Sequence, residues 1–150
     1  MNIRWYYKTF DKLSPNELYQ LLRLRSEVFV VEQNCVFLDA DNKDQGCLHC
    51  MGWVNDELAA YARIAEPGYI YTEASIGRVA TSPAHRMKGL GRELMQQSID
   101  ICRSLFGNTE IKLGAQYYLK EFYGSFGFVA IGDTYIEDGI KHIYMLLAPK

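Results

Sequence analysis

The sequence predicts an α/β (α+β) fold in which a central mixed sheet carries helices on both faces. The first observation is the order of its segments, because short β-prone runs alternate with amphipathic helical runs. The second is that no segment repeats and none is low in complexity. With 150 residues the chain can bury roughly two thirds of its unfolded surface, so we expect one domain over residues 1–150.

The N-terminal third begins with an alternating strand over residues 2–8. The run Ser14-Pro15-Asn16-Glu17 then forms a capping box with proline in the first turn, which predicts the start of a helix. We expect this helix to end near Val31 and a polar loop to follow from Glu32 to Gly46. The apolar residues that recur at helical spacing are Leu18, Leu21, Leu22, Leu24, Val28 and Phe29.

The middle of the chain predicts a hairpin with strands near 48–54 and 57–65, joined across Asn55-Asp56. After a Pro67-Gly68 break we expect a strand over residues 74–81 and then a long helix that ends at Gly107. One face of this helix should pack on the sheet. Its stripe consists of Leu90, Leu94, Ser98, Ile101, Cys102 and Leu105.

The C-terminal part predicts a strand over residues 110–115 and a short helix over residues 117–125. A last hairpin pairs residues 128–136 with residues 140–147 and turns at Asp138-Gly139. These elements complete the mixed sheet.

Charge and hydropathy exclude several classes of partner. The net charge of −2 gives no global attraction to nucleic acid or to an anionic membrane, so we expect neither as a partner. No apolar run approaches the ~20 residues that span a bilayer, and the N-terminus leads into no signal-type apolar segment. We therefore expect a cytoplasmic protein. Four cysteines at irregular positions agree with free thiols in a reducing compartment.

The two halves of the chain differ in charge. Residues 1–75 hold eleven acidic and seven basic side chains, whereas the remainder holds seven acidic and nine basic ones. If the halves face one another, the arrangement suits an anionic cofactor and a cationic or amine substrate. The alternative is that the acidic residues only solvate the surface.

Two segments resemble parts of metal sites. Cys47-Leu48-His49-Cys50 could be half of a zinc site, but a second pair of ligands is lacking, and residues three apart on a strand point to opposite faces. The acidic run from Asp39 to Asp44 has the wrong spacing for a calcium loop, and Cys50 stands where the twelfth-position Glu should be. We expect no metal, and we interpret the acidic run as a polar loop.

The most informative segment runs from Ile76 to Leu94. An apolar, β-prone run stops at Pro83, passes through a basic turn with Gly89 and Gly91, and opens an amphipathic helix. Helix N-termini expose unpaired backbone N–H groups and a partial positive charge, and glycines let a diphosphate approach them. Four Arg or Lys and no carboxylate lie between residues 76 and 92. The segment therefore predicts an anionic cofactor, with simple turn chemistry as the alternative.

Spacing distinguishes between phosphate motifs. The dinucleotide fingerprint needs a third glycine where Leu94 stands, and the nucleoside-triphosphate loop needs Gly-Lys-Ser/Thr where the chain has Gly91-Arg92-Glu93. The pattern present is Arg-x-x-Gly-x-Gly, from Arg86 to Gly91, preceded by Val79-x-Thr81-x-Pro83. It resembles the acyl-CoA pyrophosphate loop of the GNAT superfamily of N-acyltransferases.

Other segments extend this resemblance over nearly the whole chain. Residues 122–128, Phe-Tyr-Gly-Ser-Phe-Gly-Phe, resemble the second signature of the superfamily. Residues 25–33, 49–53 and 137–143 resemble the ElaA-like branch of GNAT proteins.

The resemblance implies a mostly antiparallel sheet in which the strands 74–81 and 110–115 begin paired and then splay apart. Acetyl-CoA would lie in the gap as cosubstrate, held by strand N–H groups, by the diphosphate loop and by one side-chain amide. The residues implied are Val79, Thr81, Arg86, Lys88, Gly89, Leu90, Gly91, Arg92 and Gln116. Gln116 stands where many members have Asn, and Leu119 where many have Ala, although a Gln amide offers the same donor and acceptor types.

Acetyl transfer from a thioester to an amine needs a neutral amine, a stabilised oxyanion and a proton for the leaving thiolate. The resemblance implies that the N–H group of Val79 lies near the thioester oxygen and that Tyr123 is the general acid. A phenol with a pKa near roughly 10 can protonate a thiolate whose parent thiol lies at about 8.5. The alternative for Tyr123 is a half-buried aromatic residue. A base is either absent or one of Glu32, His49, Glu137 and His142.

We take Tyr123 and Glu137 as the catalytic residues, and Glu32, Gln33 and His49 as residues of the acceptor pocket. The expected function is an N-acetyltransferase that moves an acetyl group to a primary amine by direct attack in a ternary complex. The alternative is a catalytically silent CoA-binding regulatory module. The acceptor would be a small-molecule or peptide amine, and the apolar final strand leaves a homodimer open.

Overall fold

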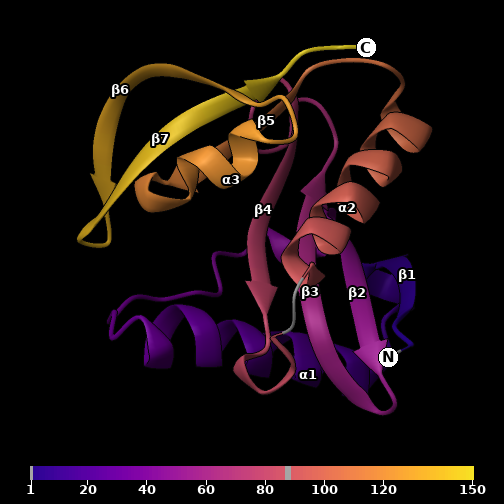
Figure 1. The fold of residues 1–150 in the computed structure, drawn as a ribbon. Helices are drawn as coiled ribbons and strands as arrows, with labels where there is room; N and C mark the ends of the chain where they lie inside the picture. Colours follow the sequence, from indigo (N-terminus) through magenta and orange to yellow (C-terminus); the bar gives the residue numbers. More distant parts are fainter. Residues whose placement is uncertain (1, 87–88) are drawn as a thin grey trace.

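The computed structural model describes residues 2–86 and 89–150, which form one seven-stranded sheet with helices on both faces (Figure 1). The strands are β1 (Arg4–Thr9), β2 (Leu48–Val54), β3 (Glu57–Ala65), β4 (Ala74–Thr81), β5 (Ile111–Gln116), β6 (Val129–Glu137) and β7 (Ile140–Leu147). The helices are α1 (Pro15–Arg25), α2 (Leu90–Phe106) and α3 (Lys120–Gly124). This arrangement confirms the predicted fold class.

The sheet has the order β1-β2-β3-β4-β5-β7-β6, and its neighbours are antiparallel except for β4 and β5. The parallel contact of β4 with β5 consists of two residue pairs, Ala74 with Ile111 and Ser75 with Lys112. Beyond these pairs β5 continues along β7 as far as Gln116. The two central strands therefore splay apart, as the resemblance implied.

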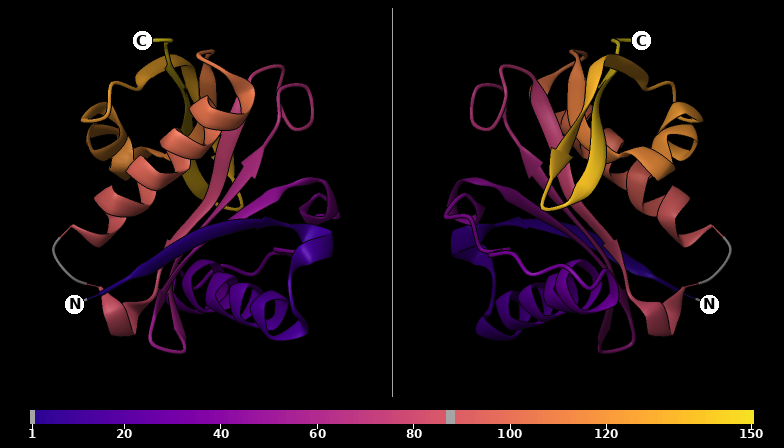
Figure 2. Two further views of the ribbon diagram at one scale, coloured as in Figure 1. Left: turned by 90° about the vertical axis from the view of Figure 1, so that its right-hand side faces the viewer. Right: turned by 90° about the vertical axis from the view of Figure 1, so that its left-hand side faces the viewer.

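Two apolar clusters hold the layers together. On one face α2 and α3 pack through residues such as Leu94, Met95 and Tyr123 against the sheet. On the other face α1 packs through Leu21 and Leu24, and the two views of Figure 2 show α1 and α2 on opposite sides of the sheet. The predicted helical stripes thus face the sheet from both sides, except that Leu105, predicted to belong to the stripe of α2, is exposed near the end of that helix.

The start of α1 has the predicted capping box. Ser14 Oγ accepts from the N–H of Glu17 at 3.0 Å, and Glu17 Oε1 accepts from the N–H of Ser14 at 2.8 Å. Tyr6 and Lys8 of β1 also donate to Glu17, at 2.6 Å and 2.9 Å. Burial opposes ionisation of Glu17, but these hydrogen bonds outweigh it and lower its pKa to about 2. One carboxylate thereby ties the first strand to the first helix.

The helix continues differently from the prediction. Regular α-helical geometry ends at Arg25, and a π-helical turn over Ser26–Glu32 carries the chain onward. Such turns are rare and often lie at functional sites. Here the turn brings Val28, Phe29 and Glu32 to the gap between β4 and β5.

Ion pairs hold the loop that follows, which contains Asp39, Asp41 and Asp44, against α1 and the sheet. Arg25 is completely buried and donates to Asp39 and Asp44, each at 2.8 Å. Arg63 of β3 donates to Asp41 at 2.8 Å and to Asp44 at 2.9 Å. Burial opposes ionisation of Asp44, but the two arginines hold its pKa below the ordinary value. The segment predicted as a plain polar loop is therefore an ordered ionic cluster.

The described residues include no helix long and apolar enough to cross a membrane.

Candidate functional site

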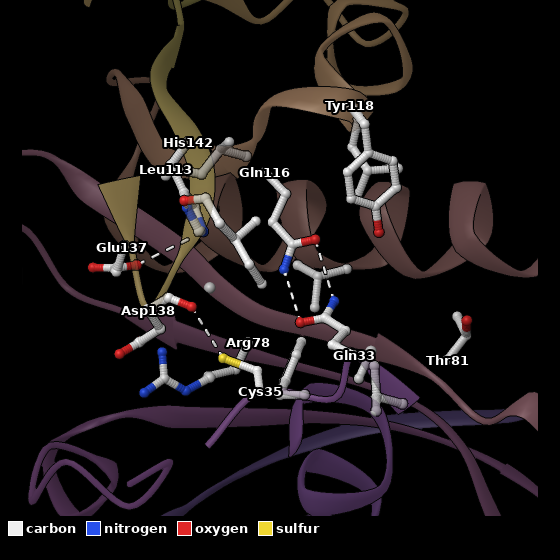
Figure 3. Close-up of a pocket in the computed structure, with 18 of the residues that line it drawn as sticks. Gln33, Cys35, Arg78, Thr81, Leu113, Gln116, Tyr118, Glu137, Asp138 and His142 are labelled. Atoms are coloured by element: carbon white, nitrogen blue, oxygen red, sulfur yellow. Dashed lines mark hydrogen bonds and ion pairs between the residues drawn. The ribbon is translucent and has the colours of Figure 1, made fainter. Parts of the chain in front are cut away.

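A cavity of about 620 Å³ opens where β4 and β5 diverge, a volume typical of sites for cofactors and drug-sized ligands. Six segments line it: residues 76–81 of β4, residues 28–37 of the helix exit and its following loop, Arg86 with Gly91 at the start of α2, the end of β5, α3 with the turn before it, and the β6–β7 turn with the start of β7. Residues from these segments converge on the cavity in Figure 3.

The β4 wall of the cavity is a strand edge. Residues from Ile76 to Thr81 have no pairing with β5, because that pairing stops at Ser75. An unpaired edge presents backbone N–H and C=O groups to an extended ligand at spacings that a neighbouring strand would otherwise use. Val79 and Thr81, whose N–H groups were predicted to hold the cosubstrate, both lie on this wall.

The N-terminus of α2 forms one end of the site. Gly89 is its N-cap with a φ of 90°, and a glycine has no side chain to satisfy the first N–H groups of the helix. Gly91 lines the cavity, and Leu90 is buried in the core beneath it. The predicted contact at Lys88 lies outside the described residues.

Two predicted basic residues differ in position. Arg86 lines the cavity, whereas Arg92 lies beside α3, where it donates to Ser125 Oγ at 2.8 Å. Its guanidinium also sits 4.5 Å from the ring centre of Phe126. Arg92 therefore contributes charge near the helix N-terminus without lining the cavity.

Arg86 and Glu32 form a two-pronged ion pair at the cavity. Each guanidinium nitrogen, Nη1 and Nη2, lies 2.6 Å from one oxygen of the carboxylate. This contact raises the pKa of Arg86 and lowers the pKa of Glu32. Arg86 was predicted to bind the cofactor and Glu32 to face the acceptor, so the structure brings the two predicted subsites into contact. Here the acidic half of the chain meets the basic half.

The side-chain amides of Gln33 and Gln116 pair with each other across the cavity (Figure 3). Each amide donates to the oxygen of the other at 3.2 Å. Gln33 comes from the helix exit and Gln116 from the end of β5, so this pair links the two walls. It also joins a predicted acceptor residue to a predicted cofactor residue.

Tyr123 is buried in α3, and only 6% of its surface is exposed. The rings of Phe122 and Phe128 lie edge-on to it, with centroids 5.2 Å and 6.2 Å away. Burial raises the pKa of Tyr123 to about 12. Its phenol therefore stays protonated at neutral pH while lining the cavity.

The β6–β7 turn forms the far end of the cavity (Figure 3). Glu137 Oε2 lies 3.8 Å from Nε2 of His142, and Nδ1 of His142 lies 2.8 Å from the carbonyl oxygen of Ile140. Because a carbonyl only accepts, Nδ1 carries the proton and Nε2 of the neutral ring can accept one. The thiol of Cys35 donates to the carbonyl of Asp138 at 3.1 Å, which joins the helix-exit loop to this turn.

His49 lies away from the cavity, contrary to the expectation that it lines the acceptor pocket. It is completely buried in β2, two strands from the gap. Its Nδ1 lies 2.6 Å from the hydroxyl of Tyr61, and its Nε2 lies 2.9 Å from the carbonyl of Asp44. Burial lowers its pKa, so the neutral ring serves as a hydrogen-bonding core residue.

Sequence reasoning missed the arginine of the β4 wall. Arg78 lines the cavity and donates to Asp39, and neither residue was predicted to belong to the site. The sequence did contain a signal that the acidic loop binds buried arginines, because Arg25 falls on an apolar helical face and Arg63 within an apolar strand. A buried arginine needs a carboxylate partner, and the carboxylates of the acidic loop are available for that role.

In the described part of the chain, no group of three or more His, Cys, Asp or Glu could hold a metal ion. Cys47 and Cys50 are buried free thiols, and burial raises the pKa of each to about 11.

The family comparison agrees with this geometry. The family model for the acetyltransferase (GNAT) domain matches residues 16–148 of the sequence, so the chain belongs to the GNAT acetyltransferase family. This membership supports acyl transfer from a coenzyme A thioester as the general class of activity.

Similarity to individual relatives indicates the branch of the family. The chain is 43% identical to the ElaA protein of Escherichia coli K12 over 145 residues, which cover 95% of each chain. It is also 43% identical to a UPF0039 protein of Synechocystis over 147 residues, covering 97% of this chain and 96% of the relative. The predicted ElaA-like resemblance is thus confirmed.

Solved structures show the same fold. An acyl-CoA N-acyltransferase from Pseudomonas aeruginosa superposes with a TM-score of 0.93 at 40% identity, covering 98% of this chain and 100% of that one. The crystal structure of Escherichia coli ElaA gives a TM-score of 0.90 at 42% identity, covering 97% and 99%.

Proposed function

We propose that the protein is an N-acetyltransferase that moves an acetyl group from acetyl-CoA to a primary amine by direct attack in a ternary complex. The observation that carries this proposal is the divergence of β4 from β5. It leaves an unpaired strand edge along a cavity of about 620 Å³, with the N-terminus of α2 at one end and Tyr123 on the opposite wall. A thioester carried on a long, anionic arm fits this shape and charge.

The cofactor would be held in three sections. The N–H groups of Val79 and Thr81 would bind the pantetheine along the edge of β4. The diphosphate would lie at the N-terminus of α2, where the backbone of Gly89, Leu90 and Gly91 offers donors. Arg86 would add charge there once it leaves Glu32. Lys88 of the same loop and Arg92 in the first turn of α2 would add further charge, and Gln116 would act from the end of β5.

The glycines of the loop fit a diphosphate. Apart from its neighbours in the chain and the backbone of α2, no described atom lies within 4 Å of a Cβ added to Gly89. At Gly91 an added Cβ would meet only the ring of Phe122, at 3.6 Å.

Tyr123 would donate a proton to the departing thiolate. Its pKa of about 12 lies above the ~8.5 of an ordinary thiol, so full transfer to a solvated thiolate would be unfavourable. The same burial acts on a thiolate that leaves within the cavity and raises its pKa as well. The buried thiol of Cys50 shows the direction of this effect, because burial raises its pKa to about 11. Burial of the leaving thiolate would thus narrow the difference from the pKa of Tyr123.

Glu137 would complete the proton path on the acceptor side. Its carboxylate lies 3.8 Å from Nε2 of His142 at the far end of the cavity, and this nitrogen is an acceptor when the ring is neutral. An entering ammonium can donate to both and pass one proton on, which leaves the neutral amine that attack requires.

The acceptor would be a small-molecule or peptide amine that enters as a cation. Glu32, Glu137 and Asp138 all line the cavity, and carboxylates at the entrance attract an ammonium group. We infer a cytoplasmic location, because the four cysteines are free thiols and the chemistry draws on acetyl-CoA.

A thiol-release screen with acetyl-CoA and a library of polyamines, amino sugars, peptides and lysine derivatives tests this proposal. We expect release with at least one class of amine, and acetyl-CoA should raise the melting temperature. A thermal shift without thiol release would favour the catalytically silent CoA-binding regulatory module. The lack of a shift at saturating acetyl-CoA would contradict both functions.

A further inference from the structure

The strand β4 contains a bulge in its cavity-lining half. Residue pairing with β3 runs from Ala65 opposite Ser75 to Arg63 opposite Gly77, and resumes with Tyr61 opposite Ala80. Two residues of β4, Arg78 and Val79, therefore stand opposite the single residue Ala62. A bulge of this kind removes the extra residue from the ladder and redirects the backbone that follows.

Packing on the two faces of the sheet confirms the insertion. Ile76 belongs to the apolar cluster under α2, whereas Ala80 belongs to the cluster under α1. Residues four apart on a regular strand point to the same face. The extra residue between them is what sends Ile76 and Ala80 to opposite cores.

Arg78 has a backbone conformation that arginine rarely adopts. Its φ is 51°, in the left-handed region, where a Cβ crowds the backbone. The preceding residue is Gly77, which could take a positive φ without this penalty, yet its φ is not positive. Something other than intrinsic preference must place the left-handed residue at position 78.

The side chain of Arg78 supplies that constraint. Its Nε donates to Asp39 Oδ1 at 2.8 Å, and its Nη2 donates to the carbonyl of Asp39 at 3.0 Å. A longer contact of 3.4 Å joins Nη2 to Asp41 Oδ2. These contacts come from the helix-exit loop and hold the guanidinium of Arg78 at the cavity that this residue lines (Figure 3).

The partners of Arg78 are themselves fixed. Asp39 also accepts from the buried Arg25 at 2.8 Å, and Asp41 accepts from Arg63 at 2.8 Å and 2.9 Å. The anchor is thus part of an ionic cluster built on α1 and β3 and does not depend on a mobile surface charge. Each carboxylate would keep one arginine if Arg78 were lost.

We propose that Arg78 is a positioning residue, whose ion pair with Asp39 holds the left-handed turn of the β4 bulge and thereby aims the N–H group of Val79 into the cavity. This inference rests on the proposed function, in which that N–H group faces the thioester oxygen. The acidic loop would then have a role in catalysis, because Asp39 of this loop sets the backbone geometry of β4.

Two substitutions at one position separate backbone placement from other roles. Arg78→Ala removes the ion pair with Asp39 but keeps a Cβ, so the positive φ is still sterically unfavourable. We expect kcat to fall about tenfold, which is the factor equivalent to the free-energy cost of a left-handed non-glycine residue. Arg78→Gly also removes the anchor but takes the positive φ freely. We expect Arg78→Gly to recover most of kcat, although it lacks the arginine charge just as Arg78→Ala does and has the more flexible backbone.

Turnover would be measured by thiol release from acetyl-CoA with 1,4-diaminobutane as the amine. Binding would be followed through the ¹H–¹⁵N signal of Val79 during titration with acetyl-CoA. The Val79 signal should shift in the native protein and in Arg78→Gly, and it should shift less in Arg78→Ala. The KM for acetyl-CoA should change less than kcat.

The matched control is Asn55, which has a φ of 54° in the β2–β3 turn outside the cavity. Asn55→Ala and Asn55→Gly should differ in melting temperature and agree in kcat.

Equal losses in Arg78→Ala and Arg78→Gly would overturn the proposal, and a raised amine KM in both would point to direct contact with the acceptor instead. The proposal would also be overturned if kcat simply fell in proportion to the melting temperature across the variants at positions 78 and 55. If the native protein releases no thiol with 1,4-diaminobutane or with any other amine of the screen, that result counts against the proposed function, and the Val79 signals alone decide whether Arg78 positions the bulge.

Discussion

The glycine at the N-terminus of α2 offers a sharp test of the diphosphate loop. Gly89 has a φ of 90°, and no described atom lies within 4 Å of an added Cβ. Gly68 has a φ of 89° and equally open surroundings, but it lies in the turn before β4, away from the cavity. Gly89→Val and Gly68→Val are therefore matched in backbone strain and differ in their distance from the proposed ligand.

The expected magnitudes follow from this match. A left-handed non-glycine residue costs about 1–2 kcal/mol. For a chain of this size, about 2–4 °C is lost per kcal/mol, so both variants should melt about 2–8 °C below the native protein. Acetyl-CoA at a hundred times its Kd should stabilise the native protein by about 2.7 kcal/mol, which corresponds to a shift of about 5–10 °C.

The assay is thermal unfolding with and without acetyl-CoA. Gly68→Val should keep the ligand-induced shift, whereas Gly89→Val should lose it, because the valine occupies the space in front of the helix N-terminus. A normal shift in Gly89→Val would show that the loop is ordinary turn structure. Loss of the shift in both variants would mean that strain, and not position, weakens binding.

Three further predictions concern single side chains. Tyr123→Phe should lower kcat about a hundredfold and change acetyl-CoA affinity little, because only proton donation is lost; single-turnover rates equal to the native ones would remove Tyr123 from the mechanism. Glu32→Gln should tighten acetyl-CoA binding about two- to fivefold in calorimetry, since Arg86 no longer has to leave an exposed ion pair; weaker binding would refute this exchange. The lowered pKa of Glu17 should stabilise the protein above about pH 4.5, and this stability, up to about 3 kcal/mol, should disappear as the pH falls toward 2. Urea unfolding of Glu17→Gln should show a smaller loss over the same range, and an unchanged pH profile would contradict the assignment.

Local signals made much of the fold predictable. The strands at 48–54 and 57–65 were predicted with the bounds that the structure has, because two short apolar runs and the Asn55-Asp56 turn between them are encoded within a few residues. The capping box at Ser14 and the helix end at Gly107 are local in the same sense. Such features depend on neighbours in sequence, so a single chain reveals them.

Features that depend on distant residues were less accessible. The acidic run at Asp39 is a plain polar loop until the fold brings Arg25, Arg63 and Arg78 to it. The bulge at Arg78 arises from a register shift against β3 and from that ion pair, and neither leaves a pattern in the sequence. His49 was misplaced because its family-like segment lies in β2, where burial and hydrogen bonds to Tyr61 account for the histidine.

The candidate site was predictable where a motif fixes it. The Arg86 to Gly91 pattern and Tyr123 come from two separate signatures, and the fold places Arg86, Gly91 and Tyr123 around one cavity. The contact between Arg86 and Glu32 could not be foreseen, because it joins the two halves of the chain.

A crystal structure with coenzyme A bound would test the central claim most directly. We expect the diphosphate against the N–H groups of Gly89, Leu90 and Gly91, with the pantetheine lying along β4 between Val79 and Thr81. Coenzyme A bound elsewhere on the molecule, with the gap between β4 and β5 left empty, would contradict it.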